Sequence, residues 1–159
     1  MNKKIFYLAI LTLICDQLVK VIIDLNFRFG QSVSVIKNIF YITNYHNHGA
    51  AWGLLNNQVL VIIIATLILG AVIYRFMYCF KSNWRNTLAF GLLIGGLAGN
   101  LLDRLFFGYV RDFIDLRVVN FYYPIFNIAD IALVTSVVLL IIAIIKGEDL
   151  KNGAKSRKK

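Results

Sequence analysis

Four side chains that could bind a ligand or exchange a proton are concentrated in a short part of the chain. They are Asp112, Asp115, Asn127 and Asp130, in the segments RDFID (111–115) and PIFNIAD (124–130). The rest of the chain is largely apolar, and a carboxylate within a membrane costs several kcal/mol unless it is paired or faces a cavity. Two carboxylates that close a pocket can share one proton: one takes a proton from water while its protonated partner polarises a scissile carbonyl. The segment therefore predicts peptide hydrolysis by acid–base chemistry.

The composition predicts a single membrane domain over residues 1–159. The chain is 59% hydrophobic with a mean hydropathy of +0.71, which is too apolar for an ordinary soluble domain. The net charge of +9 could suggest a nucleic-acid partner. The basic residues, however, are concentrated near the two ends and at one short loop, as topology-setting charges are. We therefore expect no nucleic-acid binding.

Four apolar stretches have the length of a bilayer span, about 20 residues. They run from about Ile5 to Ile23, Val59 to Phe80, Thr87 to Phe107 and Pro124 to Ile145. Between the first two, Ser32–Val35 alternates in polarity and Phe40–Tyr45 is rich in β-formers. The predicted fold is an all-α membrane protein with four transmembrane helices and a small extracytoplasmic β-sheet between helices one and two. We expect residues 109–123 to form an outer loop, with Pro124 at the start of the fourth helix.

Three basic segments set the expected orientation. They are Lys3-Lys4, the loop flanked by Arg75, Lys81 and Arg85, and the tail at 147–159. The positive-inside rule puts all three in the cytoplasm, so we expect both termini there and the acidic segment near the outer face.

Polar residues in the outer halves of the spans form a second group of candidates. Asp16 and Lys20 are four residues apart, so they share a helix face and could form an ion pair that only neutralises itself. Asn100 lies on one face with Asp103 and Arg104, which could be an interfacial ion pair. At 1.5 Å per residue these groups fall at a similar depth, so helices one, three and four should build one polar pocket.

Two further features of the spans affect packing and capping. Gly91, Gly95 and Gly99 form a small-residue stripe that should let another helix pack closely. Gly108 suits a helix stop. Asn127 could simply cap the fourth helix, whereas Asp130 is expected to lie deeper than a cap.

Other catalytic chemistries have little support in the sequence. Ser136 lies deep in the fourth span with no nearby histidine, and there is no zinc motif. His46 and His48 are interpreted as polar surface, and Cys15 and Cys79 as small core residues. We expect neither a metal nor a cofactor.

At the level of motifs, the sequence resembles lipoprotein signal peptidase, also called signal peptidase II. The resemblance extends over nearly the whole chain. It rests on Asp16-x-x-x-Lys20, Asn47-x-Gly49-Ala50-Ala51-Trp52, Gly99-Asn100-x-x-Asp103-Arg104, Val110-x-Asp112-Phe113-x-Asp115 and Phe126-Asn127-x-Ala129-Asp130. It implies a membrane aspartic endopeptidase of the bacterial cytoplasmic membrane that removes signal peptides from prolipoproteins, cutting before a diacylglyceryl-modified cysteine.

The resemblance also implies roles for individual residues. The catalytic pair falls on Asp112 and Asp130. Substrate-binding positions fall on Asp16, Lys20, Asn47, Gly49, Asn100, Asp103, Arg104, Asp115 and Asn127. Expected partners are diacylglyceryl prolipoproteins, membrane lipids and pocket-binding inhibitors of the globomycin type, and we expect a monomer. Arg111 departs mildly from the pattern, because its charge beside Asp112 could lower the pKa of that acid.

A different class of function would use the same acids. A small proton-coupled transporter or channel could employ intramembrane carboxylates as a relay. Such a relay needs polar groups through the whole depth, and the inner halves of the four spans contain almost no acids.

Overall fold

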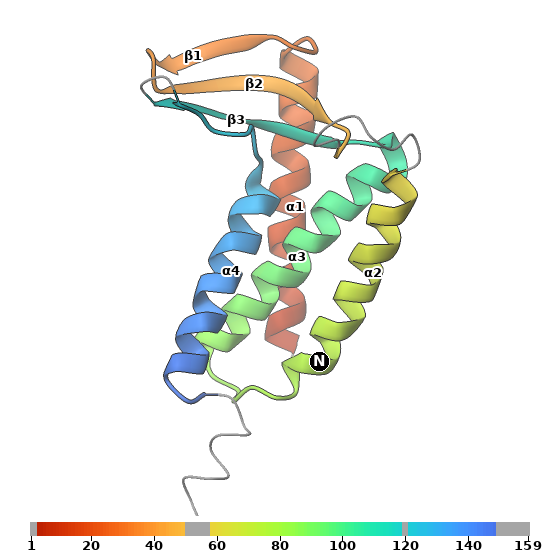
Figure 1. Ribbon diagram of the computed structural model, residues 1–159, viewed down its shortest axis with the longest axis vertical. Coiled ribbons are helices and arrows are strands. Elements are labelled where there is room, and N and C mark those ends of the chain that lie inside the picture. Colours follow the sequence, from red (N-terminus) through yellow and green to blue (C-terminus); the bar gives the residue numbers. More distant parts are fainter. Residues whose placement is uncertain (1–2, 50–57, 119–120, 149–159) are drawn as a thin grey trace, which may run out of the picture.

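The computed structural model describes residues 3–49, 58–118 and 121–148. In this part of the chain four helices stand side by side, and a sheet lies across one end of them (Figure 1). The helices are α1 (Lys3–Asn26), α2 (Gln58–Met77), α3 (Trp84–Phe107) and α4 (Ile128–Ile145). The helical core of the prediction is therefore confirmed.

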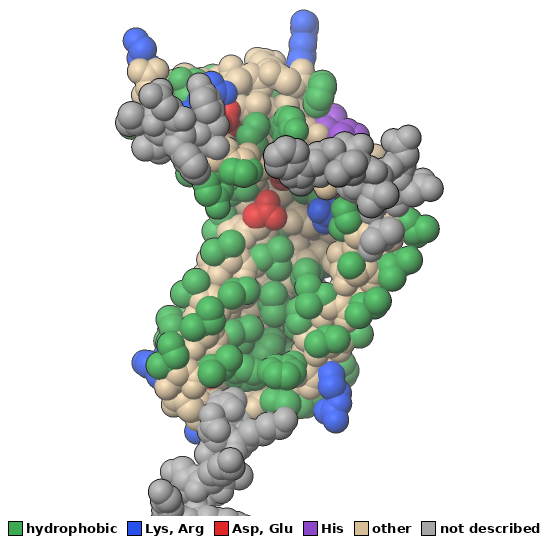
Figure 2. Space-filling model, in the orientation of Figure 1, with side chains coloured by type: hydrophobic (Ala, Val, Ile, Leu, Met, Phe, Trp, Pro, Cys, Tyr) green, Lys and Arg blue, Asp and Glu red, His purple; other side chains and the backbone are tan. Residues whose placement is uncertain are grey.

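Three helices are long and apolar enough to cross a membrane by length and composition. These are α1, α3 and α4, whereas the apolar helix found within α2, Ile62–Met77, falls short of that length among the described residues. Figure 2 shows apolar side chains over the outside of the helices, with acidic atoms exposed in the waist just below the sheet. An apolar exterior of this extent suits contact with lipid rather than water. The number of spans, predicted as four, stays a prediction.

The glycine stripe of α3 packs against α1, as predicted. A Cβ atom at Gly91 would lie 2.5 Å from Leu8 Cβ, and one at Gly95 would lie 2.6 Å from the Ala9 carbonyl oxygen. At Gly99 it would lie 2.6 Å from Asp16 Oδ2. Because carbon cannot approach so closely, glycine at these positions is what brings the polar residues of α1 against α3.

The sheet differs from the prediction because half of it comes from elsewhere in the chain. Its order is β1 (Ser32–Ile36), β2 (Phe40–Asn47), β3 (Val110–Val118) and β4 (Phe121–Tyr122), all antiparallel. The segment expected to be an outer loop is thus strand. Charged residues within β3 obscured it, since aspartate is depleted in strands. β2 needs a partner for its unpaired backbone groups, and β3 supplies it.

The start of the fourth helix was also predicted too early. Residues before it are extended, and Phe126 bridges to Ile114 of β3. α4 begins at Ile128 with Asn127 as its N-cap, and Asp130 completes a capping box with it. Asp130 therefore lies in the first turn of the helix rather than deeper than a cap. Gly108 does end α3, with a left-handed φ of 79°.

Candidate active site

Asp112, on β3, is a buried carboxylate held by two amide side chains. Asn47 Nδ2 donates to its Oδ2 at 2.9 Å, and Asn127 Nδ2 donates to its Oδ1 at 2.6 Å. Burial raises the pKa of Asp112 to about 6. The charge of Asp130 raises this pKa further, whereas the hydrogen bond from Asn47 lowers it. Asp112 can therefore hold a proton near neutral pH, as a general acid must.

Asp130 is held in a similar way at the start of α4. Asn100 Nδ2 donates to its Oδ1 at 2.7 Å, and the Asn127 backbone N–H donates to its Oδ2 at 3.2 Å. Asp130 also lines a groove of about 310 Å³ whose other walls are mostly apolar. Those walls are Leu116, Tyr123, Phe126, Ile131, Val134 and Thr135. One carboxylate of the site thus borders a space in which an apolar molecule could lie.

Asn127 joins the two acids. Its Nδ2 donates to Asp112, and its Oδ1 accepts from the backbone N–H of Asp130 at 3.0 Å. Asn127 Nδ2 also lies 3.1 Å from Oδ1 of Asn100, the residue that binds Asp130. Within the described residues no ion pair links Asp112 or Asp130 to a cation. The structure therefore brings both acids to one shared set of amides.

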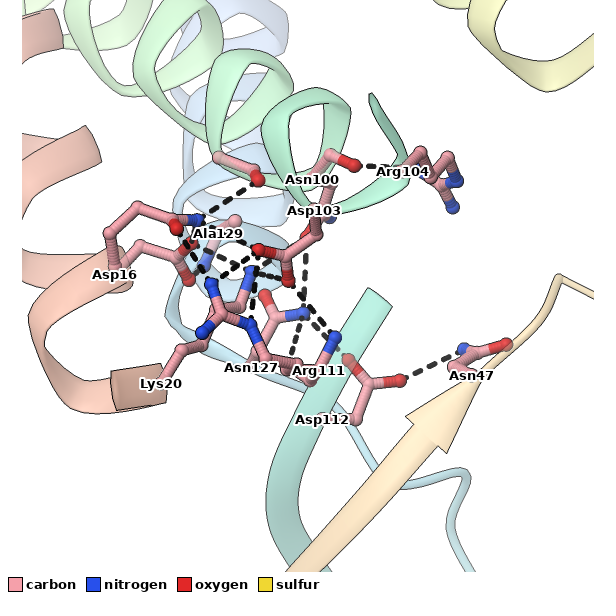
Figure 3. A network of polar contacts seen from close by, with 12 residues as sticks. Asp16, Lys20, Asn47, Asn100, Asp103, Arg104, Arg111, Asp112, Asn127 and Ala129 are labelled. Carbon is pink, nitrogen blue, oxygen red and sulfur yellow. Dashed lines mark hydrogen bonds and ion pairs between the residues drawn. The ribbon is translucent and has the colours of Figure 1, made fainter. Parts of the chain in front are cut away.

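A second group of acids lies beside the first and is paired with cations. Lys20 Nζ lies 2.7 Å from Asp16 Oδ2 and 3.0 Å from Asp103 Oδ2, and all three side chains are fully buried (Figure 3). Asp16 Oδ1 also accepts from the backbone N–H of Ala129, which ties α1 to α4. Lys20 Nζ donates to Asn100 Oδ1 at 3.2 Å, so the two groups touch. The polar residues of helices one, three and four therefore meet as predicted, but as a fully buried ion-pair cluster rather than an open pocket.

Two expectations about arginines were wrong. Asp103 pairs with Lys20 and Arg111 rather than with its neighbour Arg104. The Arg104 guanidinium points away from the cluster, and its Nη1 lies 3.3 Å from the Asn100 carbonyl oxygen (Figure 3). Arg111 does not lower the pKa of Asp112, because it projects from the other side of β3.

Two of the remaining predicted site residues lie apart from the acids. Gly49 has a positive φ of 74°, and its N–H donates to Asn47 Oδ1 at 2.9 Å, which fixes the amide that binds Asp112. Asp115 faces Thr43 and Arg117, and its hydrogen bond from Arg117 lowers its pKa. The structure does not bring Asp115 to the other predicted residues. Ala50, Ala51 and Trp52 of the motif lie outside the described residues, as does most of the basic tail.

Sequence reasoning missed three members of the cation-paired group. Gln17 Nε2 donates to Asp103 Oδ1 at 3.1 Å and to the Gly99 carbonyl oxygen at 3.1 Å. Asp24 and Arg111 form an ion pair at 3.1 Å. The available signal was helical spacing, because Asp24 follows Lys20 by four residues and lies on the face of Asp16 and Lys20.

The histidines lie in an aromatic cluster. His46 stacks on Tyr109 with ring centroids 4.0 Å apart, and burial lowers its pKa. Over the described ranges, no group of three or more His, Cys, Asp or Glu side chains is arranged to hold a metal ion.

Comparison with known proteins decides the family. A family model described as signal peptidase (SPase) II matches residues 8–146. The chain belongs to this family. The lipoprotein signal peptidase of Moorella thermoacetica is 44% identical over 136 residues, covering 84% of this chain and 87% of that protein. That of Bacillus subtilis is 40% identical over 138 residues, covering 86% and 90%.

A solved structure supports the same assignment. A bacterial membrane enzyme determined by the in meso method at 1.9 Å resolution superimposes with a TM-score of 0.83 at 36% identity. The match covers 92% of this chain and 95% of the other. As a member of the signal peptidase II family the chain is a peptidase, and its apolar helices fit a multi-pass protein of a bacterial membrane.

Proposed function

We propose that this chain removes signal peptides from prolipoproteins by using Asp112 and Asp130 as an aspartic dyad, cutting before a diacylglyceryl-modified cysteine. The observation that supports the dyad is the Asn127 side chain, which donates to Asp112 and accepts from the backbone of Asp130. Two acids on one amide, with no ion pair to a cation among the described residues, can share a single proton.

The division of roles follows from the environment of each acid. Asp112 carries the proton, because burial raises its pKa to about 6. Asp130 borders the groove and acts as the base, taking a proton from water whose oxygen attacks the scissile carbonyl carbon. Asp112 donates its proton toward the carbonyl oxygen. The C–N bond of the tetrahedral intermediate then breaks: the leaving nitrogen receives the proton that Asp130 took from water, and a hydroxyl of the intermediate returns a proton to Asp112, which restores both acids.

The groove beside Asp130 supports an apolar substrate that approaches from the membrane. Its walls come from β3, the segment before α4 and the exposed side of α4. A lipid-modified peptide could place an apolar portion there while its scissile bond lies at the dyad. An inhibitor of the globomycin type would compete for the dyad. The polar residues behind the dyad then support it and do not touch the scissile bond. These residues are Asp16, Lys20, Asn100 and Asp103.

The proposed orientation places the sheet and dyad at the outer face, with four membrane spans and both termini in the cytoplasm. The connection between α2 and α3 lies at the end of the bundle opposite the sheet (Figure 1). Lys81 belongs to that connection and Arg85 to the first turn of α3, which supports this orientation. All the residues of the site come from one chain, so we propose that a monomer suffices.

The experiment compares a prolipoprotein with and without its diacylglyceryl group, incubated with purified protein in the presence of a chelator. We expect cleavage before the cysteine of the modified form only. Equal cleavage of both forms contradicts the proposed substrate, and loss of cleavage on chelation contradicts the proposed chemistry. Asp112→Asn is the matched negative control.

A further inference from the structure

Arg111 is the residue before the proposed general acid, and each of its polar groups has a hydrogen-bond or ion-pair partner. Its backbone N–H donates to Asp103 Oδ2 at 3.0 Å, and its carbonyl oxygen lies 3.4 Å from Asn127 Nδ2. Its Nη2 donates to Asp103 Oδ1 and to Gln17 Oε1, both at 2.7 Å, and its Nη1 pairs with Asp24 Oδ2 at 3.1 Å. The side chain is 6% exposed.

These contacts link β3 to two of the three helices that meet at the site, α1 and α3. Gln17 and Asp24 belong to α1, and Asp103 belongs to α3. Asp24 also accepts from Asn44 of β2 at 3.3 Å, so the same group connects the neighbouring strand. The guanidinium lies 4.5 Å from the centre of the Phe107 ring at the end of α3. Arg111 is thus one of the points at which sheet and bundle meet.

The position of this anchor determines where Asp112 can lie. Successive residues of a strand point to opposite faces, so Arg111 faces the cation-paired group while Asp112 faces Asn47 (Figure 3). One peptide unit separates the two residues. A shift of β3 that broke the Arg111 contacts would therefore move the Asp112 carboxylate away from Asn47 and Asn127.

We infer that Arg111 is a positioning residue of the peptidase, which fixes the catalytic face of β3 by joining it to Asp103, Asp24 and Gln17. The inference rests on the proposed role of Asp112 as general acid. Lysine cannot replace the arginine fully, because one ammonium cannot reach acceptors on two helices in the planar geometry of a guanidinium.

The test measures cleavage kinetics, their pH dependence and thermal stability for Arg111→Lys and Arg111→Gln. We expect Arg111→Gln to lower kcat by roughly 10- to 100-fold at nearly unchanged KM, as displacement of a catalytic group by about 1 Å does. The pH midpoint of kcat/KM should move, because the two amide hydrogen bonds to Asp112 are disturbed. Arg111→Lys should retain more activity than Arg111→Gln. Asp24→Asn should add little to Arg111→Gln, since both remove the same contact.

The matched control is Arg117→Gln, which removes another arginine of β3 that pairs with a carboxylate, Asp115. It should leave kcat and the pH midpoint unchanged. Wild-type kcat and pH midpoint in Arg111→Gln overturn the inference, as does equal damage by Arg117→Gln. If Asp112→Asn itself cleaves normally, the proposed dyad fails. If Asp112→Asn is inactive while Arg111→Gln is fully active, the dyad stands and only the positioning role of Arg111 is refuted.

Discussion

The two groups of acids at the sheet end of the bundle differ in what holds them. Asp16 and Asp103 are bound by Lys20 and Arg111, whereas Asp112 and Asp130 are bound by asparagine amides. A cation beside a buried carboxylate fixes it in the charged state. A neutral amide can hydrogen-bond to either protonation state by using its N–H or its carbonyl. The first group is therefore suited to hold the fold together, and the second to exchange protons.

The contact between the groups explains why they lie together. Asn100 accepts from Lys20 and donates to Asp130, so it faces a cation on one side and the proposed catalytic base on the other. Its donor is thereby directed toward Asp130. The charged group thus orients the amides on which the proposed chemistry depends, in the way that supporting contacts fix catalytic side chains in other sites.

The largest effect should come from the amide-held acids. Asp112→Asn and Asp130→Asn should each lower kcat by roughly 10⁴-fold or more, and the double variant should be scarcely worse, because residues that act as a unit are not additive. Both variants should fold, since asparagine has nearly the shape of aspartate and still offers an oxygen that accepts hydrogen bonds. Cleavage assays and thermal unfolding in detergent measure the two properties. Near wild-type turnover in either variant contradicts the division into two groups.

The next effect should come from the cation-paired group and should appear in stability. Lys20→Met leaves Asp16 and Asp103 facing each other without that cation, which should lower the free energy of unfolding by about 3 to 5 kcal/mol. Arg85→Gln is the control, because its pair with Glu148 at the other end of the bundle is partly exposed. That variant should lose much less stability than Lys20→Met, because solvent screens the pair. Denaturant unfolding in micelles measures the stability of both variants. An equal loss of stability in Lys20→Met and Arg85→Gln would contradict the special role of the cation-paired group.

The smallest effect is expected at Asp115, on the same strand as Asp112. Its hydrogen bond from Arg117 lowers its pKa, so it resembles the cation-paired acids. Asp115→Asn should retain most of the wild-type kcat and lose up to about 1 kcal/mol of stability, because Arg117 is partly exposed. A folded but inactive Asp115→Asn variant would indicate that Asp115, rather than Asp112, is the catalytic acid of RDFID.

Spacing within a helix predicted much of this architecture. The Asp16–Lys20 pair, the glycine stripe on α3 and the stop at Gly108 follow from periodicities of three to four residues and from glycine stereochemistry. These features depend on one element and its immediate neighbour. They could therefore be predicted from the sequence of that element.

Adjacency in sequence was misleading for contacts across elements. Asp103 and Arg104 are neighbours on a helix, and consecutive helical residues do not face each other. Arg111 and Asp112 are neighbours on a strand, so they point to opposite faces. Asp103 pairs instead with Lys20 of α1 and Arg111 of β3, and the pair with Arg111 forms because β3 lies across the end of the bundle. No local pattern reveals that pairing, because it depends on how the sheet docks.

The pH dependence of kcat/KM tests the central claim most directly, because it reports the protons held by the free enzyme. Asp112 has a pKa raised to about 6 and must be protonated to act, so kcat/KM should fall as the pH rises above about 6. It should also fall at low pH, once both acids are protonated, with two apparent pKa values that belong to the pair. A profile that stays flat from about pH 5 to about pH 8, a range of roughly three units that includes that value, would contradict proton sharing by Asp112 and Asp130.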